Sequence, residues 1–194
     1  MQHSEAPWRE LARAHDELNA MCAAESVDVR QRHWNDFLRA LDRLWNKADA
    51  SFGRSPKWPA STGRYVQARR QDELLAYLTQ ARNAEEHSDV PASSLRPGGF
   101  PVGVGPNDRT FIKSMYIDGH GRLAHYVGNA PLTIHEPQVN VHEVENRGRK
   151  YPPPRSHLGQ AITPDVLVMA EAGFAYYKAF LEAAEEKFVG NRSH

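Results

Sequence analysis

The sequence predicts a mainly α-helical domain with a small antiparallel β-sheet inserted before its last helix. Four segments repeat apolar residues with the period of an amphipathic helix, namely residues 4–24, 29–50, 71–88 and 163–190. Residues 108–147 instead alternate apolar and polar side chains around turn residues, which is typical of β-hairpins. We therefore expect residues 1–194 to form one domain with a β-rich insertion at about 108–147.

The first two predicted helices have the clearest apolar faces. In residues 4–24, Trp8, Leu11 and Leu18 follow helical spacing. Aromatic side chains that stack on nucleic-acid bases must be exposed, so we expect the aromatic residues of the second helix to lie in the core. The apolar positions of that helix are Trp34, Phe37, Leu38, Leu41, Leu44, Trp45 and Ala48.

The central helix is predicted to begin near Arg64 and to continue through residues 71–88, with Leu74, Leu78 and Ala81 facing the core. Residues 51–63 contain two prolines and two glycines and are expected to form a loop before it. Trp58 lies in that loop, where it either covers the edge of the bundle or is exposed to a partner.

The second half of the central helix carries an arginine, an amide and an imidazole: Arg82, Asn83 and His87. At about 100° per residue, Arg82 and His87 lie about 140° apart around the helix axis. One helix therefore does not direct both side chains at one point. Two copies that cross at a two-fold axis could bring the arginine of one chain to the histidine of the other.

The run RNAEEH at residues 82–87 resembles the R-x4-6-H signature of the HEPN superfamily, small α-helical domains that include metal-independent RNases of toxin and defence systems. The resemblance implies a four-helix bundle, a homodimer with the motif at its interface, and RNA cleavage without a cofactor or a metal. His87 would be the general base on the ribose 2′-hydroxyl, Arg82 would stabilise charge on the phosphate, and Asn83 would orient the phosphate or the His ring. An antitoxin or a nucleotidyltransferase is the partner protein that the resemblance implies.

Seven further basic side chains are candidates for RNA contacts, because guanidinium and ammonium groups pair with phosphates. Three lie on or near the central helix, and four lie in the basic, proline-rich connection at residues 146–158. The alternative for the first three is a solvated helix face paired with nearby carboxylates. The candidates are Arg64, Arg69, Arg70, Arg147, Arg149, Lys150 and Arg155.

The middle of the chain changes from helical to β-type patterning. Residues 90–107 are rich in Pro, Gly and Ser and predict a long loop. Strands are expected at residues 110–117 and 122–128, joined by a hairpin turn at 118–121, with a third strand at 139–145. Four histidines in this part of the chain suggest a metal site as an alternative, but their spacing fits no zinc motif and a polar sheet face is the other interpretation.

The last predicted helix begins at Thr163, which suits an N-cap, followed by Pro164 at the first helical position. Its apolar face is broad, so we expect this helix to be central or to contribute to a dimer interface. Gly190 is a natural end.

Composition limits the function classes. The formal net charge is zero and the pI is about 7.2, so the chain as a whole does not attract nucleic acid, and any RNA site must be a local basic patch. The single cysteine, Cys22, excludes an intramolecular disulfide. No signal peptide and no apolar run near 18 residues is present, so we expect a cytoplasmic protein without a membrane anchor.

The sequence therefore favours a metal-independent endoribonuclease of HEPN type that acts through Arg82, Asn83 and His87. The alternative is a non-catalytic helical module that binds a partner protein or a nucleotide. In that alternative Arg82 pairs with Glu85 or Glu86 and His87 caps the helix. An open cleft lined by Arg82 and His87 supports the enzyme, and pairing within one chain supports the binding module.

Overall fold

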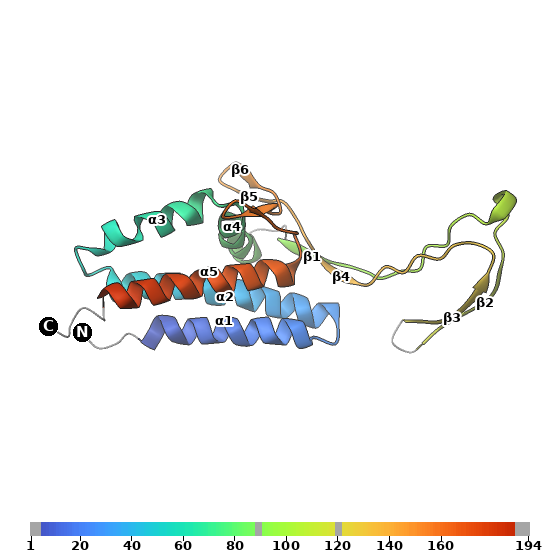
Figure 1. Ribbon diagram of the computed structural model, residues 1–194, viewed down its shortest axis with the longest axis horizontal. Coiled ribbons are helices and arrows are strands. Elements are labelled where there is room, and N and C mark those ends of the chain that lie inside the picture. Colours follow the sequence, from blue (N-terminus) through green and yellow to red (C-terminus); the bar gives the residue numbers. More distant parts are fainter. Residues whose placement is uncertain (1–4, 88–90, 119–121, 189–194) are drawn as a thin grey trace. The chain divides into compact units, whose positions relative to one another are not determined.

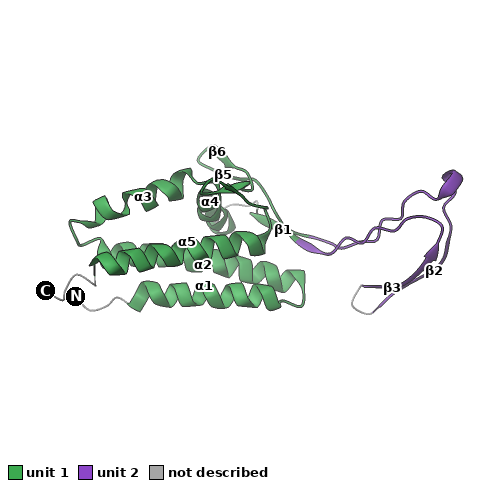
Figure 2. Ribbon diagram, in the orientation of Figure 1, with its two compact units in different colours: residues 1–95, 139–194 green, residues 96–138 purple. Residues whose placement is uncertain are grey.

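The chain forms two compact units in a computed structural model that describes residues 5–87, 91–118 and 122–188 (Figure 1). Unit 1 contains residues 1–95 and 139–194, and unit 2 contains residues 96–138 (Figure 2). The insertion was expected at about 108–147, whereas unit 2 begins and ends earlier in the chain. No helix in the described ranges has the length and apolar character needed to cross a membrane.

Unit 1 is built from helices, as predicted. The helices are α1 (Glu5–Ala23), α2 (Val27–Phe52), α3 (Trp58–Gln71), α4 (Glu73–His87) and α5 (Val166–Phe188). In Figure 1, α1 lies alongside α2 and α5, and both helices contact it. Ser26 separates α1 from α2 because its hydroxyl accepts a hydrogen bond from the Val29 amide at 3.3 Å, which caps the start of α2. The mainly α-helical class, with small antiparallel sheets and a C-terminal helix, is confirmed.

The core of unit 1 contains the residues that the helical patterns indicate. Trp34 and Phe37 of α2 are fully buried, as expected, whereas Trp45 is only half-buried and packs against the edge of the core. Leu74, Leu78 and Ala81 of α4 are buried as well. Residues 74–78 of α4 are all buried, because this helix contacts α2, α3 and α5 and also the strands β5 (Val144–Asn146), β6 (Arg149–Tyr151) and β7 (Ser156–His157).

The central helix is broken, contrary to the prediction of one continuous helix from about Arg64 to residue 88. Asp72 adopts an extended ψ of 130°, and its Oδ1 accepts a hydrogen bond from the Leu75 amide at 3.0 Å. An aspartate in this position ends one helix and caps the next, because its side chain replaces a backbone acceptor. The result is two helices, α3 and α4, that run in different directions (Figure 1).

Helix α3 also begins earlier than expected, since part of the predicted loop at 51–63 is helical. Trp58 is buried against Phe52 and Phe188, with ring centroids 5.3 and 5.4 Å away, and its Nε1 donates to Asp49 Oδ1 at 2.8 Å. This burial by distant aromatic residues is a tertiary effect that local sequence does not reveal. Of the two alternatives for Trp58, the structure supports the one in which it covers the edge of the bundle.

In the part of the chain that the structure describes, the strands form four two-stranded sheets, rather than the single small sheet that we expected. The predicted hairpin is present as β2 (Ile112–Ile117) and β3 (Leu123–Gly128), while its turn at 119–121 lies outside the described residues. The predicted strand at 139–145 is divided between β4 (Gln138–Val141), which pairs with β1 (Ser93–Arg96), and β5 (Val144–Asn146), which pairs with β6 (Arg149–Tyr151). The fourth sheet pairs β7 (Ser156–His157) with β8 (Gln160–Ala161).

Two tight turns explain why the proline-rich connection at 146–158 contains strands. Arg147 and Gly148 have φ angles of 53° and 75°, and Leu158 and Gly159 have φ angles of 48° and 81°. Two consecutive residues with positive φ produce the turn that matches the twist of a two-stranded hairpin, and glycine at the second position lowers its cost. Residues 90–107, expected to be loop, likewise contribute β1 and a short 3-10 helix at Pro106–Asp108.

Candidate functional site

One hollow of unit 1 has a volume of about 500 Å³ and is lined by residues of α2, α3, α4 and β6. We call it the arginine pocket because three of the predicted RNA-binding residues line it. These are Arg69, Arg70 and Arg149, and the wall also includes Trp45, Gln80 and Tyr151. Helix α3 and strand β6 lie far apart in the sequence, so only the fold brings these guanidinium groups together.

Arg69 forms the fixed part of the pocket wall. Its guanidinium lies 4.2 Å from the centre of the Trp45 ring, and its Nη2 donates to Thr79 Oγ1 at 3.4 Å. Its Nε is buried and has no hydrogen-bond partner among the described residues. Burial also raises the pKa of the neighbouring Tyr177 phenol, although the Arg69 guanidinium acts in the opposite direction.

Arg70 and Arg149 are the available cations of the pocket. Both side chains are exposed, and Arg70 forms no hydrogen bond or ion pair within the described part of the chain. The Arg149 guanidinium lies 5.1 Å from the centre of the Tyr151 ring, a cation–π arrangement. Asp49 is the carboxylate in the wall, and its Oδ1 is engaged by the Trp58 indole. The pocket therefore carries excess positive charge.

Arg82 lies in the second half of α4 and is held by acidic groups of its own chain. Its Nη2 is 2.8 Å from Glu86 Oε2 and 3.4 Å from Asp42 Oδ2, and its side chain is 24% exposed. Its Nη1 donates to Asn83 Oδ1 at 3.2 Å. Pairing with Glu86 is what the binding-module alternative predicts. Asn83 in turn donates to Gln80 Oε1 at 3.3 Å, and His87 is the last residue of α4, with its side chain outside the described part.

Asp42 connects Arg82 with the arginine pocket. Its Oδ2 faces Arg82, and its Oδ1 is 4.0 Å from Arg69 Nη2. The acidic residues inside the motif also have defined positions: Glu86 pairs with Arg82, and Glu85 Oε1 accepts a hydrogen bond from the Ala92 amide at 2.9 Å. One arginine of the motif and one arginine of the pocket therefore share a carboxylate.

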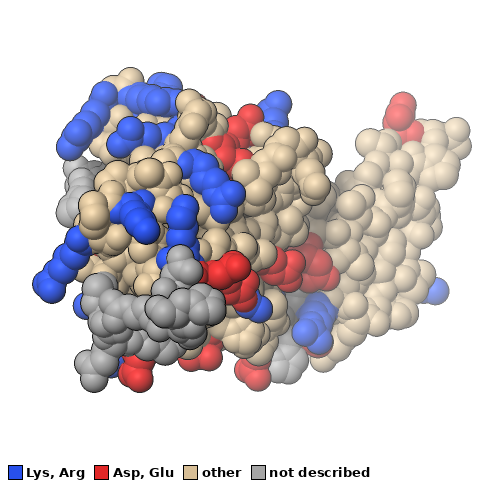
Figure 3. Space-filling model, turned by 60° about the vertical axis from the view of Figure 1, so that its left-hand side comes forward, with Lys and Arg blue, Asp and Glu red and all other residues tan. Residues whose placement is uncertain are grey.

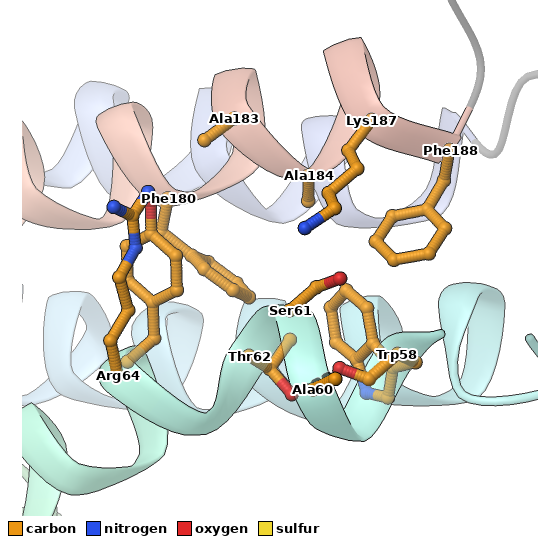
Figure 4. Close-up of a pocket in the computed structure, with 11 residues that line it drawn as sticks. Trp58, Ala60, Ser61, Thr62, Arg64, Phe180, Ala183, Ala184, Lys187 and Phe188 are labelled. Carbon is orange, nitrogen blue, oxygen red and sulfur yellow. Dashed lines mark hydrogen bonds between the residues drawn. The ribbon is translucent and has the colours of Figure 1, made fainter. Parts of the chain in front are cut away.

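Arg64 lines a different hollow, between α3 and α5 (Figure 4). This hollow has a volume of about 290 Å³ and a mixed wall that includes the aromatic residues Trp58 and Phe188 and the cation Lys187. The Arg64 guanidinium donates to the Tyr65 hydroxyl at 2.6 Å and lies 4.6 Å from the centre of that ring. Arg64 is thus separated from the predicted RNA-binding residues that meet in the arginine pocket.

The other three predicted RNA-binding residues also lie outside the arginine pocket. Arg147 is exposed in the turn between β5 and β6. Lys150 pairs with Glu143 at 2.9 Å, and this carboxylate raises the pKa of its ammonium group. The backbone amide of Arg155 donates to Glu73 Oε2 at 2.9 Å, so Arg155 lies at the beginning of α4. Arg82 lies in the other half of that helix.

The described histidines of the β-rich segment do not form a metal-binding cluster. His125 Nε2 contacts Ser114 Oγ at 2.9 Å, and His142 Nε2 contacts Ser94 Oγ at 2.6 Å. Within residues 5–87, 91–118 and 122–188, no group of three His, Cys, Asp or Glu side chains could hold a metal ion.

Sequence reasoning did not identify Tyr151, Gln80 or Asp42 as site residues. Tyr151 follows Arg149 by two positions, and alternate residues of a strand share a face. That signal was available, but it required the strand β6 to be recognised first. Gln80 and Asp42 gave no separate signal, because a polar residue on an amphipathic helix is usually part of the solvated face.

Basic side chains gather on one face of unit 1, at the upper left of Figure 3. Comparison of the chain with protein-family models, with curated proteins and with solved structures finds no match. The geometry of the arginine pocket and of Arg82 is therefore the basis for a functional proposal.

Proposed function

We propose that this chain binds single-stranded RNA through the arginine pocket. The observation that carries the proposal is the meeting of Arg69, Arg70 and Arg149 with the Tyr151 ring around one hollow of about 500 Å³. Ligand pockets in proteins have volumes of roughly 300–1,000 Å³, so a nucleotide unit has a suitable space here. Guanidinium groups match phosphate oxygens, and an aromatic ring accepts the face of any base.

The pocket residues have different tasks in this proposal. Arg70 and Arg149 are exposed and bind phosphate oxygens, while Arg69 stays fixed on Trp45 and adds positive charge to the wall. Arg149 and Tyr151 together form a platform on which a base can stack. The formal net charge of the chain is zero, so the attraction is local and we expect modest affinity.

The contacts of Arg82 are the reason for ranking RNA binding above RNA cleavage as the proposed function. Its guanidinium is paired with Glu86 and Asp42 of the same chain. These carboxylates offset the positive charge that would otherwise stabilise a phosphodiester during cleavage. Pairing within one chain is the arrangement expected of a helical binding module.

The test is the dissociation constant of a fluorescein-labelled single-stranded RNA, measured by anisotropy. Charge-assisted hydrogen bonds contribute about 1.5–3 kcal/mol each, so Arg70→Gln and Arg149→Gln should each weaken binding about 10-fold or more. Arg147→Gln is the matched control, because it removes an exposed arginine from the same β5–β6 hairpin outside the pocket. Equal effects of Arg147→Gln and Arg149→Gln would refute the proposal.

Salt dependence provides an independent measurement. Each phosphate contact on single-stranded nucleic acid contributes about 0.7 to the slope of log K against log salt. The double variant Arg70→Gln/Arg149→Gln should therefore lower the magnitude of that slope by about 1.4. An unchanged slope would show that these side chains do not contact phosphates.

RNA cleavage of HEPN type is the second candidate, and the carboxylate shared by Arg69 and Arg82 favours it. Because Asp42 lies between these two guanidinium groups, RNA in the arginine pocket would lie next to the motif. His87 would then take the proton of a ribose 2′-hydroxyl, and Arg82, released from Glu86 in a homodimer through α4, would stabilise the phosphate. The 2′-oxygen would attack the adjacent phosphorus as the bond from phosphorus to the 5′-oxygen breaks, which leaves a 2′,3′-cyclic phosphate on one product and a 5′-hydroxyl, protonated from solvent, on the other.

Cleavage is tested with Arg82→Ala and His87→Ala, each of which should abolish the cyclic-phosphate product while the circular dichroism of the folded protein persists. Arg147→Ala is the control and should cleave normally. Cleavage that survives in both motif variants would eliminate this candidate. If the unsubstituted protein binds RNA without cleaving it, the proposal of an RNA-binding module stands alone.

A further inference from the structure

Unit 2 is an antiparallel ribbon of two chain segments. Strands β2 and β3 pair over most of their length, with Met115 opposite Tyr126, and bridges join Gly99 to His135 and Val102 to Leu132. Backbone hydrogen bonds between residues 99 and 135 and between 103 and 131 continue the pairing beyond the strands. We call residues 96–138 the ribbon.

The ribbon has almost no interior. Among its described residues only Gly105 and Ala130 are buried, and no residue of β2 or β3 is buried on either face. A two-stranded sheet is marginally stable in water unless a third strand or another surface packs on it. The ribbon therefore needs a surface to cover it.

The exposed apolar side chains of this protein are concentrated in the ribbon. Of the ten large hydrophobic side chains that are exposed in the described part of the chain, seven belong to residues 96–138. Scattered exposed hydrophobics are normal, but a group of this size on one short segment marks an interaction surface. The seven are Val104, Phe111, Ile112, Tyr116, Ile117, Val127 and Ile134.

The charge of the ribbon indicates a protein partner. Residues 96–138 contain four basic residues (Arg96, Arg109, Lys113, Arg122) and three acidic residues (Asp108, Asp118, Glu136), so their formal net charge is 4 − 3 = +1. A nucleic-acid surface would need an excess of Lys and Arg, whereas a nearly neutral apolar surface suits another apolar surface.

Within this chain, the ribbon itself is the matching surface. The other exposed large hydrophobics in the described residues are Leu95, Leu158 and Val168, which belong to β1, the β7–β8 turn and α5 and do not form a comparable group. We propose that the ribbon is a dimerisation surface that packs against the ribbon of a second copy of this chain. The open edges of β2 and β3 suit such pairing, since a two-fold axis places the same edge on both sides.

The exposed area is sufficient for a dimer contact. Phe111 is 59% exposed and Tyr116 is 62% exposed. Large aromatic side chains bury roughly 150–250 Å² each, so these two side chains and the five aliphatic ones offer roughly 600 Å² in all, counted over both faces of the ribbon. A standard interface buries about 800 Å² per partner, and the polar ribbon atoms around the apolar group supply the remainder. This dimer would not depend on the α4 contact that HEPN-type cleavage requires.

The first experiment measures the molar mass of the full chain in solution by light scattering after size exclusion, across a concentration series. We expect a dimer whose dissociation constant rises about 100-fold or more in Phe111→Ser/Tyr116→Ser, because buried aromatic anchors dominate interface energies. Leu158→Ser is the matched control: its side chain is 61% exposed but lies in unit 1, and its substitution should leave the dimer intact.

Cross-linking provides a second measurement, in which Phe111 and Tyr116 are not replaced together. In Cys22→Ser/Tyr116→Cys, a short bismaleimide should join two copies through their ribbons, whereas the control Cys22→Ser, which has no cysteine, should not be joined. A monomer at all concentrations would overturn the proposal. So would a dimer that is unchanged in the Phe111/Tyr116 variant and is not cross-linked through position 116.

Discussion

The carboxylate of Asp72 holds the break between α3 and α4 and also anchors the β7–β8 hairpin. Its Oδ1 accepts hydrogen bonds from the Leu75 amide at 3.0 Å and pairs with His157 Nδ1 at 2.9 Å, and its Oδ2 accepts from the Leu158 amide at 2.7 Å. The side chain is only 8% exposed. Replacing Asp72 with alanine therefore removes the N-cap of α4, the anchor of the Leu158 amide and the hydrogen-bond partner of His157 at once.

The expected loss follows from these contacts. An N-cap contributes about 1 kcal/mol, and each of the hydrogen bonds to Leu158 and His157 contributes about 1 kcal/mol. Water can reach the Leu158 amide, which reduces its share, so we expect Asp72→Ala to lower the free energy of unfolding by about 2–3 kcal/mol. Asp72→Asn keeps an oxygen acceptor for the cap and should cost less, about 1–2 kcal/mol.

Urea unfolding followed by far-UV circular dichroism measures these differences. Asp36→Ala is the control, because its carboxylate is 49% exposed in a pair with Arg39 one helical turn away, and such surface pairs contribute less than about 1 kcal/mol. If Asp72→Ala changed the unfolding free energy no more than Asp36→Ala, the assignment of Asp72 as a structural anchor would be incorrect.

Two further predictions concern the core of unit 1. A Cβ atom at Gly173 would lie 2.7 Å from Leu78 Cδ1. Gly173→Val should therefore overpack the contact between α5 and α4 and lower the free energy of unfolding by about 1–3 kcal/mol. An unchanged melting temperature would contradict this close approach. Burial raises the pKa of the Tyr77 phenol, and Glu85 adds to the shift. A raised folded-state pKa stabilises the protein below the unfolded-state value of about 10, and this contribution is lost as pH increases above it. Absorbance at 295 nm reports tyrosine ionisation, and the difference between the unsubstituted protein and Tyr77→Phe gives the contribution of Tyr77. Tyr77 should ionise only when the protein unfolds, so ionisation of Tyr77 near pH 10 in the folded protein would refute this prediction.

Helix periodicity was enough to predict where most helices lie. The stripe through Trp34 and Phe37 predicted α2, and the broad apolar face of the last segment predicted α5, because burial of these faces is a property of the segment itself. The expected start at Thr163 was wrong: α5 begins at Val166, because the Asp165 carboxylate accepts hydrogen bonds from the Leu167 and Val168 amides and caps the helix. The start of α3 at Trp58 was not predictable from local sequence, since it depends on contacts with Phe188, which is distant in the chain.

The candidate site was predictable only as a set of residue types. The run that begins at Arg82 and Asn83 indicated the polar half of α4, and the basic residues around Arg69 and Arg149 indicated phosphate contacts. Which of the arginines meet in one pocket depends on the helix break at Asp72 and on the β5–β6 hairpin. The pairing of Arg82 with Asp42 also depends on the packing of α4 on α2, a long-range contact that spacing does not specify.

The pairing of β1 with β4 has a consequence for how the sequence of this protein can evolve. These two strands mark the points where the chain leaves the helical body and returns to it, and their hydrogen bonds keep those points adjacent. The cost of closing a segment between fixed, adjacent ends rises only by about 0.6 kcal/mol for each doubling of its length. Segments of other lengths and sequences can therefore be accommodated at this junction while Trp34 and Tyr77 keep their packing, so the inserted segment can vary in evolution more freely than the helical body.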